Sequence, residues 1–342
     1  MAATTPRVSV LLPCRNAATT VDEAVESVLR QTLDDLEVVA VDDGSTDETP
    51  ARLDRWAELD PRMRLLRRPR GGLIESLNAG LAECRAPLIA RMDADDRSRP
   101  ERFASQAALL DSRTDLAAVG CLVEAFPPQA IGPGLKLYLD WQNSLTTAEA
   151  IAREIYVESP LVHPSVMLRA GWVRNVGGYQ DHGWPEDYDL WLRLHAAGGR
   201  FAKVPQMLFD WREHPGRLTH GDPRYAIDSF LRAKSHYLSL GPLQDRQSVI
   251  LWGAGIVGKK LSRLLLAEGL PLRAFVDVDP AKIGRTRRGL PVIAPQDFMT
   301  LWRQSPQPVL LATVGARGAR AVVREQITAL GLVEGQDWWA VA

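Results

Sequence analysis

The chain has 342 residues, of which 46% are hydrophobic and 24% charged, so it is long enough to bury two hydrophobic cores and has the composition of an ordinary globular protein. Its 41 basic and 42 acidic residues leave a formal net charge of −1. This balance excludes the strong positive field with which many proteins bind nucleic acid, so we expect no nucleic-acid partner.

The cysteine content and the hydropathy pattern indicate the compartment. Three cysteines, Cys14, Cys84 and Cys121, are too few and too scattered for a disulfide framework or a zinc site. The N-terminal segment lacks the apolar core of a signal peptide, and no stretch reaches the roughly 18 to 20 apolar residues of a membrane-spanning helix. The sequence therefore predicts a cytoplasmic protein without a membrane span and leaves peripheral association with a membrane open.

Short apolar strands alternate with amphipathic helices along the first third of the chain. Strands are predicted over 7–13, 36–43, 62–68, 87–93 and 116–126, and helices over 19–31, 45–59, 72–84 and 100–111. In the second of these helices, Ser45 and Glu48 have the spacing of a capping box. The alternation predicts an α/β fold with a mainly parallel sheet that is covered on both faces.

Polar residues stand at the carboxyl ends of the predicted strands, where sheets of this kind bind their ligands. Pro13, Asp42, Asp43 and the run Asp93–Asp96 occupy these positions, so we expect them to line one crevice. The carboxylates of the run repel one another unless a cation neutralises them, and Mg²⁺ and Mn²⁺ prefer oxygen ligands. A solvated turn that caps the next helix is the alternative explanation for the run taken alone.

Six segments stand together in an order that is typical of one enzyme family. They are VSVLLPCRN at 8–16, LEVVAVDDGSTDET at 36–49, LNAGLA at 77–82, ARMDADDRSRPERF at 90–103, HPSVMLR at 163–169 and VGGYQDHGWPEDYDLWLRL at 176–194. In these segments the chain resembles glycosyltransferase family 2, the inverting enzymes of GT-A fold. One residue departs from the family pattern, because Arg15 precedes Asn16 where the family often has Tyr.

The resemblance implies a nucleotide-sugar donor and a divalent metal, Mn²⁺ or Mg²⁺. Asp43, with Asp42, would accept a hydrogen bond from the nucleotide base. The implied donor-binding residues are Pro13, Asn16, Asp42, Asp43, Asp93 and Arg212. The implied metal ligands are Asp95, Asp93 and His214, of which His214 is in a segment over 207–220 that returns towards the site.

A second acidic pair, Glu186 and Asp187, follows Pro185 at the start of a predicted helix. Acidic residues there are favoured by the helix dipole without any catalytic role. The resemblance instead implies that Asp187 is the general base, which takes the proton of the acceptor hydroxyl during a single in-line displacement. His163, in HPSVMLR, would line the acceptor side or be a buried, hydrogen-bonded histidine, and we favour the second interpretation.

Three aromatic residues in Gly- and Pro-rich loops are open to two interpretations. Trp141, Tyr179 and Trp184 would stack on sugar rings or pack the loops onto the protein. Nothing in the sequence names the acceptor beyond a saccharide or a lipid-linked saccharide.

The C-terminal part forms a separate domain in this interpretation. We predict a glycosyltransferase domain over 1–222, a helical linker over 223–247 and a smaller Rossmann-like α/β domain over 248–342. Gly253, Gly255 and Gly258 form a G-x-G-x-x-G turn between a strand and a helix, and Asp277 ends the next strand.

NAD or another nucleotide is the ligand that this glycine turn would hold. The sequence after Asp277 offers no hydride-transfer constellation, so we favour a nucleotide-binding, regulatory or assembly module over a redox enzyme. Whether the turn holds a ligand is left open.

The sequence thus predicts an inverting, metal-dependent glycosyltransferase that moves a sugar from a nucleotide-sugar to a hydroxyl acceptor in bacterial polysaccharide or glycoconjugate synthesis. The alternatives are an NAD-dependent sugar oxidoreductase, which would explain only the last domain, and a non-catalytic nucleotide-sugar sensor. A nucleotidyl transferase also uses carboxylates at strand ends with a metal, but it has no task for the Glu186–Asp187 pair.

Overall fold

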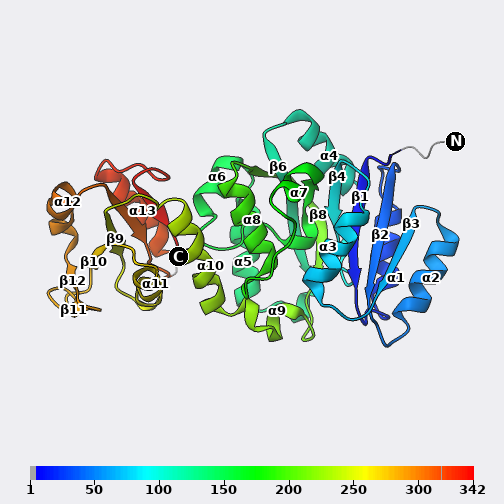
Figure 1. Ribbon diagram of the computed structural model, residues 1–342, viewed down its shortest axis with the longest axis horizontal. Helices are drawn as coiled ribbons and strands as arrows, with labels where there is room; N and C mark the ends of the chain where they lie inside the picture. The colour runs from blue at the N-terminus through cyan, green and yellow to red at the C-terminus, as the bar shows by residue number, and fades with distance from the viewer. Residues whose placement is uncertain (1–4, 317) are drawn as a thin grey trace. The chain divides into compact units, whose positions relative to one another are not determined.

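The computed structural model describes residues 5–316 and 318–342, and the chain forms two units (Figure 1). The first unit contains the residues up to Ala152, Pro160–His182 and Glu186–Gly221. The second contains Arg153–Ser159, Gly183–Pro185 and Asp222–Ala342. The segment expected to be a linker therefore lies in the second unit, together with two short segments from inside the expected first domain.

Eight strands form the sheet of the first unit, in the order β3-β2-β1-β4-β7-β6-β8-β5. They are β1 (Val8–Cys14), β2 (Leu36–Asp43), β3 (Met63–Arg68), β4 (Leu88–Arg91), β5 (Arg97–Ser98), β6 (Leu116–Phe126), β7 (Met167–Arg169) and β8 (Arg200–Arg212). β7 runs antiparallel to β4 and β6, and β5 runs antiparallel to β8, whereas the other neighbours are parallel. The predicted fold class, a mainly parallel GT-A-like α/β sheet followed by a smaller sheet domain, is confirmed.

The helices of the first unit lie between and after its strands. They are α1 (Val21–Leu29), α2 (Thr49–Leu59), α3 (Leu73–Glu83), α4 (Arg102–Ser112), α5 (Pro133–Ser144), α6 (Ala148–Glu154), α7 (Ala170–Asn175), α8 (Glu186–Ala196) and α9 (Leu218–Gly221). Helix α6 continues into the second unit with its last two residues. The central strands β1 and β2 are buried along their whole length, because helices pack on the sheet. A Cβ on Gly80 would lie 2.3 Å from Leu11 Cδ1, so only glycine lets α3 pack this closely on β1.

The capping box expected at Ser45 and Glu48 is wrong, because α2 begins later, at Thr49. The hydroxyl of Ser45 accepts a hydrogen bond from the Asn16 N–H at 3.0 Å instead. Gly44 takes a positive φ of 63°, and the turn after β2 uses the side chains that the pattern assigned to a helix start.

A six-stranded sheet, in the order β11-β12-β10-β9-β13-β14, forms the core of the second unit. Its strands are β9 (Ser248–Trp252), β10 (Leu272–Val276), β11 (Thr286–Arg287), β12 (Leu290–Ile293), β13 (Pro308–Ala312) and β14 (Trp338–Ala340). Its helices are α10 (Ile227–Leu240), α11 (Ile256–Ala267), α12 (Pro295–Gln304) and α13 (Ala319–Ala329). All neighbouring strands are parallel except β11 and β12.

Two contacts explain why a segment from the middle of the chain belongs to this unit. The Glu154 carboxylate forms ion pairs of 2.9 Å with Arg320 and 2.8 Å with Arg324. The Lys234 ammonium donates to the Val157 carbonyl oxygen at 2.6 Å. Within the described parts of the chain, every helix is too short or too polar to cross a membrane.

A buried lysine joins α5 to the sheet of the first unit. Lys203 of β8 is 3% exposed, and its Nζ donates to the main-chain and side-chain carbonyl oxygens of Gln142. Burial lowers the pKa of Lys203 to about 7, because the charged ammonium loses its hydration.

We expect replacement of Lys203 by Met to remove a rise in stability between about pH 7 and pH 10. In this interval the unfolded chain holds a proton on Lys203 that the folded chain has lost, so the folded state gains stability as the pH rises. Urea unfolding at several pH values should show the wild type gaining about 1 kcal/mol or more relative to the variant. An identical pH dependence of the two proteins would contradict this assignment.

Candidate functional site

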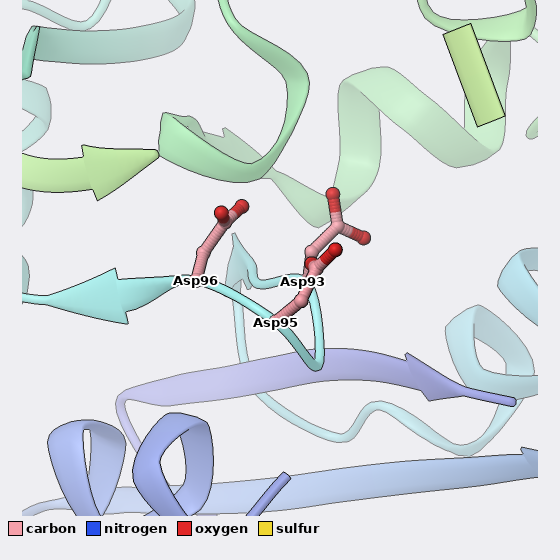
Figure 2. A group of neighbouring side chains, drawn as sticks. All are labelled: Asp93, Asp95 and Asp96. Carbon is pink, nitrogen blue, oxygen red and sulfur yellow. The ribbon is translucent and has the colours of Figure 1, made fainter. Parts of the chain in front are cut away.

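Three carboxylates gather in the turn after β4 (Figure 2). Asp93, Asp95 and Asp96 each offer an oxygen, and these oxygens lie within 4.8 Å of one another. Asp96 is 1% exposed, and its Oδ1 accepts a hydrogen bond of 2.7 Å from the Arg212 N–H. Its buried Oδ2 has no hydrogen-bond partner among the described residues.

The electrostatics of this turn favour a bound cation. Burial, together with the charges of Asp95 and Asp93, raises the pKa of Asp96 well above its ordinary value. A buried acceptor without a partner is costly, and a hard divalent cation would satisfy it. The donor set, which is made of oxygens with one nearby imidazole, fits Mg²⁺ or Mn²⁺.

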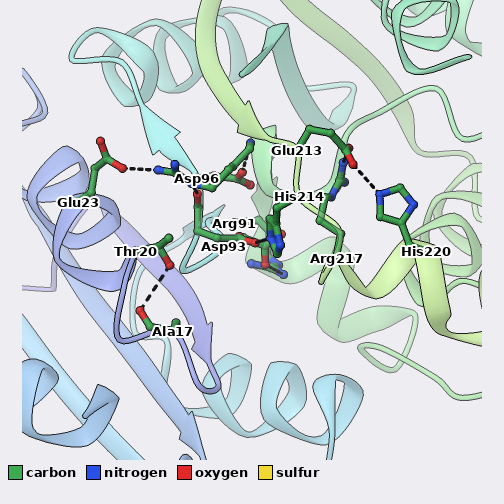
Figure 3. A network of polar contacts seen from close by, with 12 residues as sticks. Ala17, Thr20, Glu23, Arg91, Asp93, Asp96, Glu213, His214, Arg217 and His220 are labelled. Carbon is green, nitrogen blue, oxygen red and sulfur yellow. Dashed lines mark hydrogen bonds and ion pairs between the residues drawn. The ribbon is translucent and has the colours of Figure 1, made fainter. Parts of the chain in front are cut away.

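The chain after β8 brings basic side chains to the same turn (Figure 3). His214 Nε2 lies 2.9 Å from Asp95 Oδ2, so the structure brings together two of the predicted metal ligands. The Arg212 guanidinium donates to the Asp95 carbonyl oxygen at 2.6 Å and also pairs with Glu23. Arg217 pairs with Glu213 at 2.8 Å.

One residue of this site was missed by the sequence reasoning. Arg91, the last residue of β4, is 1% exposed, and its Nη2 donates to Asp93 Oδ1 at 2.6 Å. A second donation goes to the Met92 carbonyl oxygen. The available signal was an arginine at the end of an apolar strand, directly before the acidic run.

The predicted base-binding residues lie at the ends of β1 and β2. These strands are in parallel register, with Pro13 opposite Val41, so their carboxyl ends meet at one edge. Asp42 Oδ1 accepts from the Ser45 N–H at 3.1 Å.

Two further predicted donor-binding residues hold turns in place. The Asp43 carboxylate accepts from the backbone N–H groups of Gly71 and Gly72 at 2.8 Å and 3.0 Å. Asn16 Oδ1 accepts from the Thr46 N–H at 2.9 Å. These bonds fix the carboxylate of Asp43, and a carboxylate has further lone pairs with which to accept from a ligand.

The two acidic residues at the start of α8 differ in their surroundings. Glu186 is 1% exposed and its Oε1 lies 3.8 Å from His163 Nδ1, whereas Asp187 is half-buried. Asp187 Oδ1 accepts from the Tyr188 N–H at 2.7 Å. The acid that the sequence selected as the general base is thus the more accessible of the pair.

The three aromatic candidates separate into different environments. Tyr179 is 3% exposed, so its ring has no open face for a sugar. The ring of Trp184 packs 5.5 Å from that of His236 in α10. Trp141 is half-buried on α5, with its ring 5.9 Å from that of Tyr138. The interpretation of His163 as a buried, hydrogen-bonded residue is confirmed, because its Nε2 lies 2.9 Å from the Tyr179 hydroxyl.

The glycine turn of the second unit has the close packing that its pattern predicts. Gly253 has a φ of 122°, and a Cβ on Gly258 would lie 2.0 Å from the Gly253 carbonyl oxygen. Gly255 begins the turn into α11 and has open space around it.

Asp277, however, is engaged inside the protein. Its Oδ2 accepts from the Ala254 N–H at 2.8 Å and lies 3.2 Å from Lys282 Nζ. The carboxylate that would bind the ribose of NAD therefore holds the turn itself, and these residues fit a dinucleotide poorly.

Comparison with known proteins identifies the family. The sequence profile of Glycosyl transferase family 2 matches residues 9–176. The chain is 34% identical over 192 residues to the amylovoran biosynthesis glycosyltransferase AmsE of Erwinia amylovora, a match that covers 56% of this chain and 70% of that protein. It is 29% identical over 237 residues to the UDP-Gal:alpha-D-GlcNAc-diphosphoundecaprenol beta-1,3-galactosyltransferase of Escherichia coli, covering 68% of this chain and 84% of that protein.

A solved structure shares the fold. The crystal structure of S. aureus TarS 1-349 in complex with UDP-GlcNAc matches with a TM-score of 0.57 and 16% sequence identity, covering 76% of this chain and 71% of that chain. The sequence matches and the geometry of the first unit agree, and the chain belongs to glycosyltransferase family 2.

Proposed function

We propose that this protein is an inverting, metal-dependent glycosyltransferase that moves a sugar from a nucleotide-sugar donor to a hydroxyl group of a saccharide or lipid-linked saccharide. The observation that carries the proposal is the cluster of Asp93, Asp95 and Asp96, whose carboxylate oxygens lie within 4.8 Å of one another, with His214 Nε2 2.9 Å from Asp95 Oδ2. A role in bacterial polysaccharide or glycoconjugate synthesis is supported by the names of the relatives, which refer to amylovoran biosynthesis and to a diphosphoundecaprenol-linked acceptor.

Asp93, Asp95 and His214 would hold Mn²⁺ or Mg²⁺. The metal, when bound, neutralises the negative charge that the leaving diphosphate gains. Asp96 orients this turn through the Arg212 N–H, and the Arg212 guanidinium, which pairs with Glu23, would contact the diphosphate of the donor.

At the other end of the donor, Asp43 would accept a hydrogen bond from the nucleotide base. Its bonds to the Gly71 and Gly72 N–H groups fix the carboxylate before the nucleotide arrives. Asp42, Pro13 and Asn16 would complete this pocket at the edge where β1 and β2 end.

Asp187 acts as the general base in this mechanism. Its carboxylate takes the proton of the acceptor hydroxyl while the hydroxyl oxygen forms a bond to the anomeric carbon. The bond from that carbon to the diphosphate oxygen breaks on the opposite side, and its electron pair leaves with the diphosphate. A single displacement of this kind inverts the anomeric centre and requires no covalent intermediate.

The second unit is best explained as a Rossmann-like accessory module with a regulatory or assembly role. The engagement of Asp277 with Ala254 and Lys282 argues against an NAD-dependent oxidoreductase. A cytoplasmic location, where nucleotide-sugars are made, agrees with this function. A non-catalytic sensor would have no use for the accessible Asp187 beside the buried Glu186.

Replacement of Asp95 by Ala should lower the affinity for UDP, measured in the presence of Mn²⁺, by ~10²-fold or more, because it removes a metal ligand. Isothermal calorimetry with UDP and Mn²⁺ measures this directly. Asp210→Asn is the matched control, since Asp210 pairs with Arg99 at 2.6 Å and should leave UDP affinity unchanged. Unchanged UDP affinity in Asp95→Ala would refute the metal assignment.

Replacement of Asp187 by Asn should lower turnover by ~10² to 10⁴ while the affinity for UDP holds, because Asn keeps the size of Asp but cannot accept the proton. Glu186→Gln should lower turnover much less than Asp187→Asn does. Hydrolysis of a panel of UDP- and GDP-sugars with Mn²⁺ first identifies the donor, and the same assay then gives the turnover of each variant. Near-normal turnover in Asp187→Asn, or greater damage in Glu186→Gln, would show that the base is misassigned.

A further inference from the structure

A line of buried and half-buried polar residues runs through the first unit and is not used by the proposed chemistry. It begins at Asn78 in α3, whose side-chain amide forms two hydrogen bonds with the backbone of Tyr179. Asn78 Nδ2 donates to the Tyr179 carbonyl oxygen at 2.8 Å, and the Tyr179 N–H donates to Asn78 Oδ1 at 2.9 Å. Gly178 has a φ of 69°, and a Cβ there would lie 2.7 Å from Asn78 Oδ1. The LNAG segment (77–80) and the VGGY segment (176–179) therefore contact each other directly.

The line continues from Tyr179 to α8 through His163. The Tyr179 hydroxyl is 2.9 Å from His163 Nε2, and His163 Nδ1 is 3.8 Å from Glu186 Oε1. The imidazole also packs edge-on against Trp191 of α8, with ring centroids 6.0 Å apart. Burial, together with the charge of Arg91, holds the pKa of His163 well below its ordinary value, so the ring is neutral. The 2.9 Å contact with the Tyr179 hydroxyl is a hydrogen bond of the ring, whereas Glu186, at 3.8 Å, lies in packing contact with it.

Tyr179 lies within electrostatic range of both carboxylate groups of the site. Burial raises the pKa of its phenol above the ordinary value, and the charges of Arg91, Glu186, Asp187 and Asp93 also act on it. Arg91 in turn is bonded to Asp93 at 2.6 Å. The phenol therefore feels the charges of both acidic segments, the turn after β4 and the start of α8.

We propose that Tyr179 and His163 are positioning residues for Asp187, because the His163 ring, held by the Tyr179 hydroxyl, packs on Trp191 and against Glu186 and so supports the first turn of α8. This inference rests on the proposed role of Asp187 as the base. Successive residues of a helix project about 100° apart, so a fixed Glu186 determines the direction in which Asp187 points. Small misplacements of a catalytic group are costly, up to ~10² in rate for about 1 Å.

The test is Tyr179→Phe, which removes the hydroxyl and keeps the ring. Turnover in the sugar-nucleotide hydrolysis assay should fall about 5- to 20-fold, with the affinity for Mn²⁺ and UDP within about twofold of the wild type. Ser165→Ala is the matched control: it lies in the same 3-10 turn as His163 (His163–Ser165), and its Oγ donates to the Val162 carbonyl oxygen at 2.7 Å. This variant also loses one buried hydroxyl, yet its turnover should stay near normal.

A double variant tests whether Tyr179 and Glu186 affect turnover through the same contact with α8. Tyr179→Phe combined with Glu186→Gln should be no slower than the slower single variant, because both changes release the same turn of α8. Additive losses in the double variant would overturn the proposal. So would a Tyr179→Phe protein that melts at a lower temperature but keeps normal turnover, since its hydroxyl would then serve stability alone.

The outcome is separable from that of the proposed function. Normal turnover in Asp187→Asn would refute the role of Asp187 as the base, and this inference with it. Low turnover in Asp187→Asn together with normal turnover in Tyr179→Phe would refute only the positioning role of Tyr179. A Tyr179→Phe variant that loses UDP affinity in step with turnover would place the phenol in donor binding and contradict the proposal.

Discussion

The hydrogen bond between the Asp96 carboxylate and the Arg212 N–H is the contact on which the site depends. It ties the turn after β4 to the last residue of β8, and the Arg212 guanidinium adds a bond to the Asp95 carbonyl oxygen. β5, which follows the turn, pairs antiparallel with β8 directly beside these bonds. The acidic turn is therefore held at both ends, and the chain beyond β8 delivers His214 to Asp95.

Much of this arrangement could be predicted from the sequence, because the alternation of strands and helices is a local pattern. It gave the parallel strands correctly and placed the acidic run at a strand end, where the structure has it. β7 was not foreseen, since a strand of three residues has no readable period. The capping box failed because Ser45 bonds to Asn16, a contact between distant parts of the chain. The contact between Asn78 and Tyr179 was not foreseen for the same reason.

The two units divide the chain in a way that a linear pattern cannot reveal. Arg153–Ser159 and Gly183–Pro185 sit inside the sequence of the first unit but fold with the second. Glu154 pairs with two arginines that lie more than 160 residues later in the chain, and its own carboxylate is buried. Composition shifts mark boundaries only where a domain is one continuous stretch, so they could not locate these segments.

Charge balance explains why so many ionic groups are tolerated at the acidic turn. Arg212 pairs with Glu23 and Arg217 with Glu213, although the charge of Arg217 still acts on Asp93 and Asp96. Arg91 is bonded to Asp93 and offsets one of the three carboxylates. Beneath it, Arg102 is satisfied by the carbonyl oxygens of Arg91 and Val166, although burial lowers its pKa to about 10. Burial beside the other carboxylates raises the pKa of Asp96 well above its ordinary value, so the turn resists carrying three full negative charges without a cation. A divalent cation would relieve this crowding, while the buried Arg91 offsets Asp93 from inside the protein.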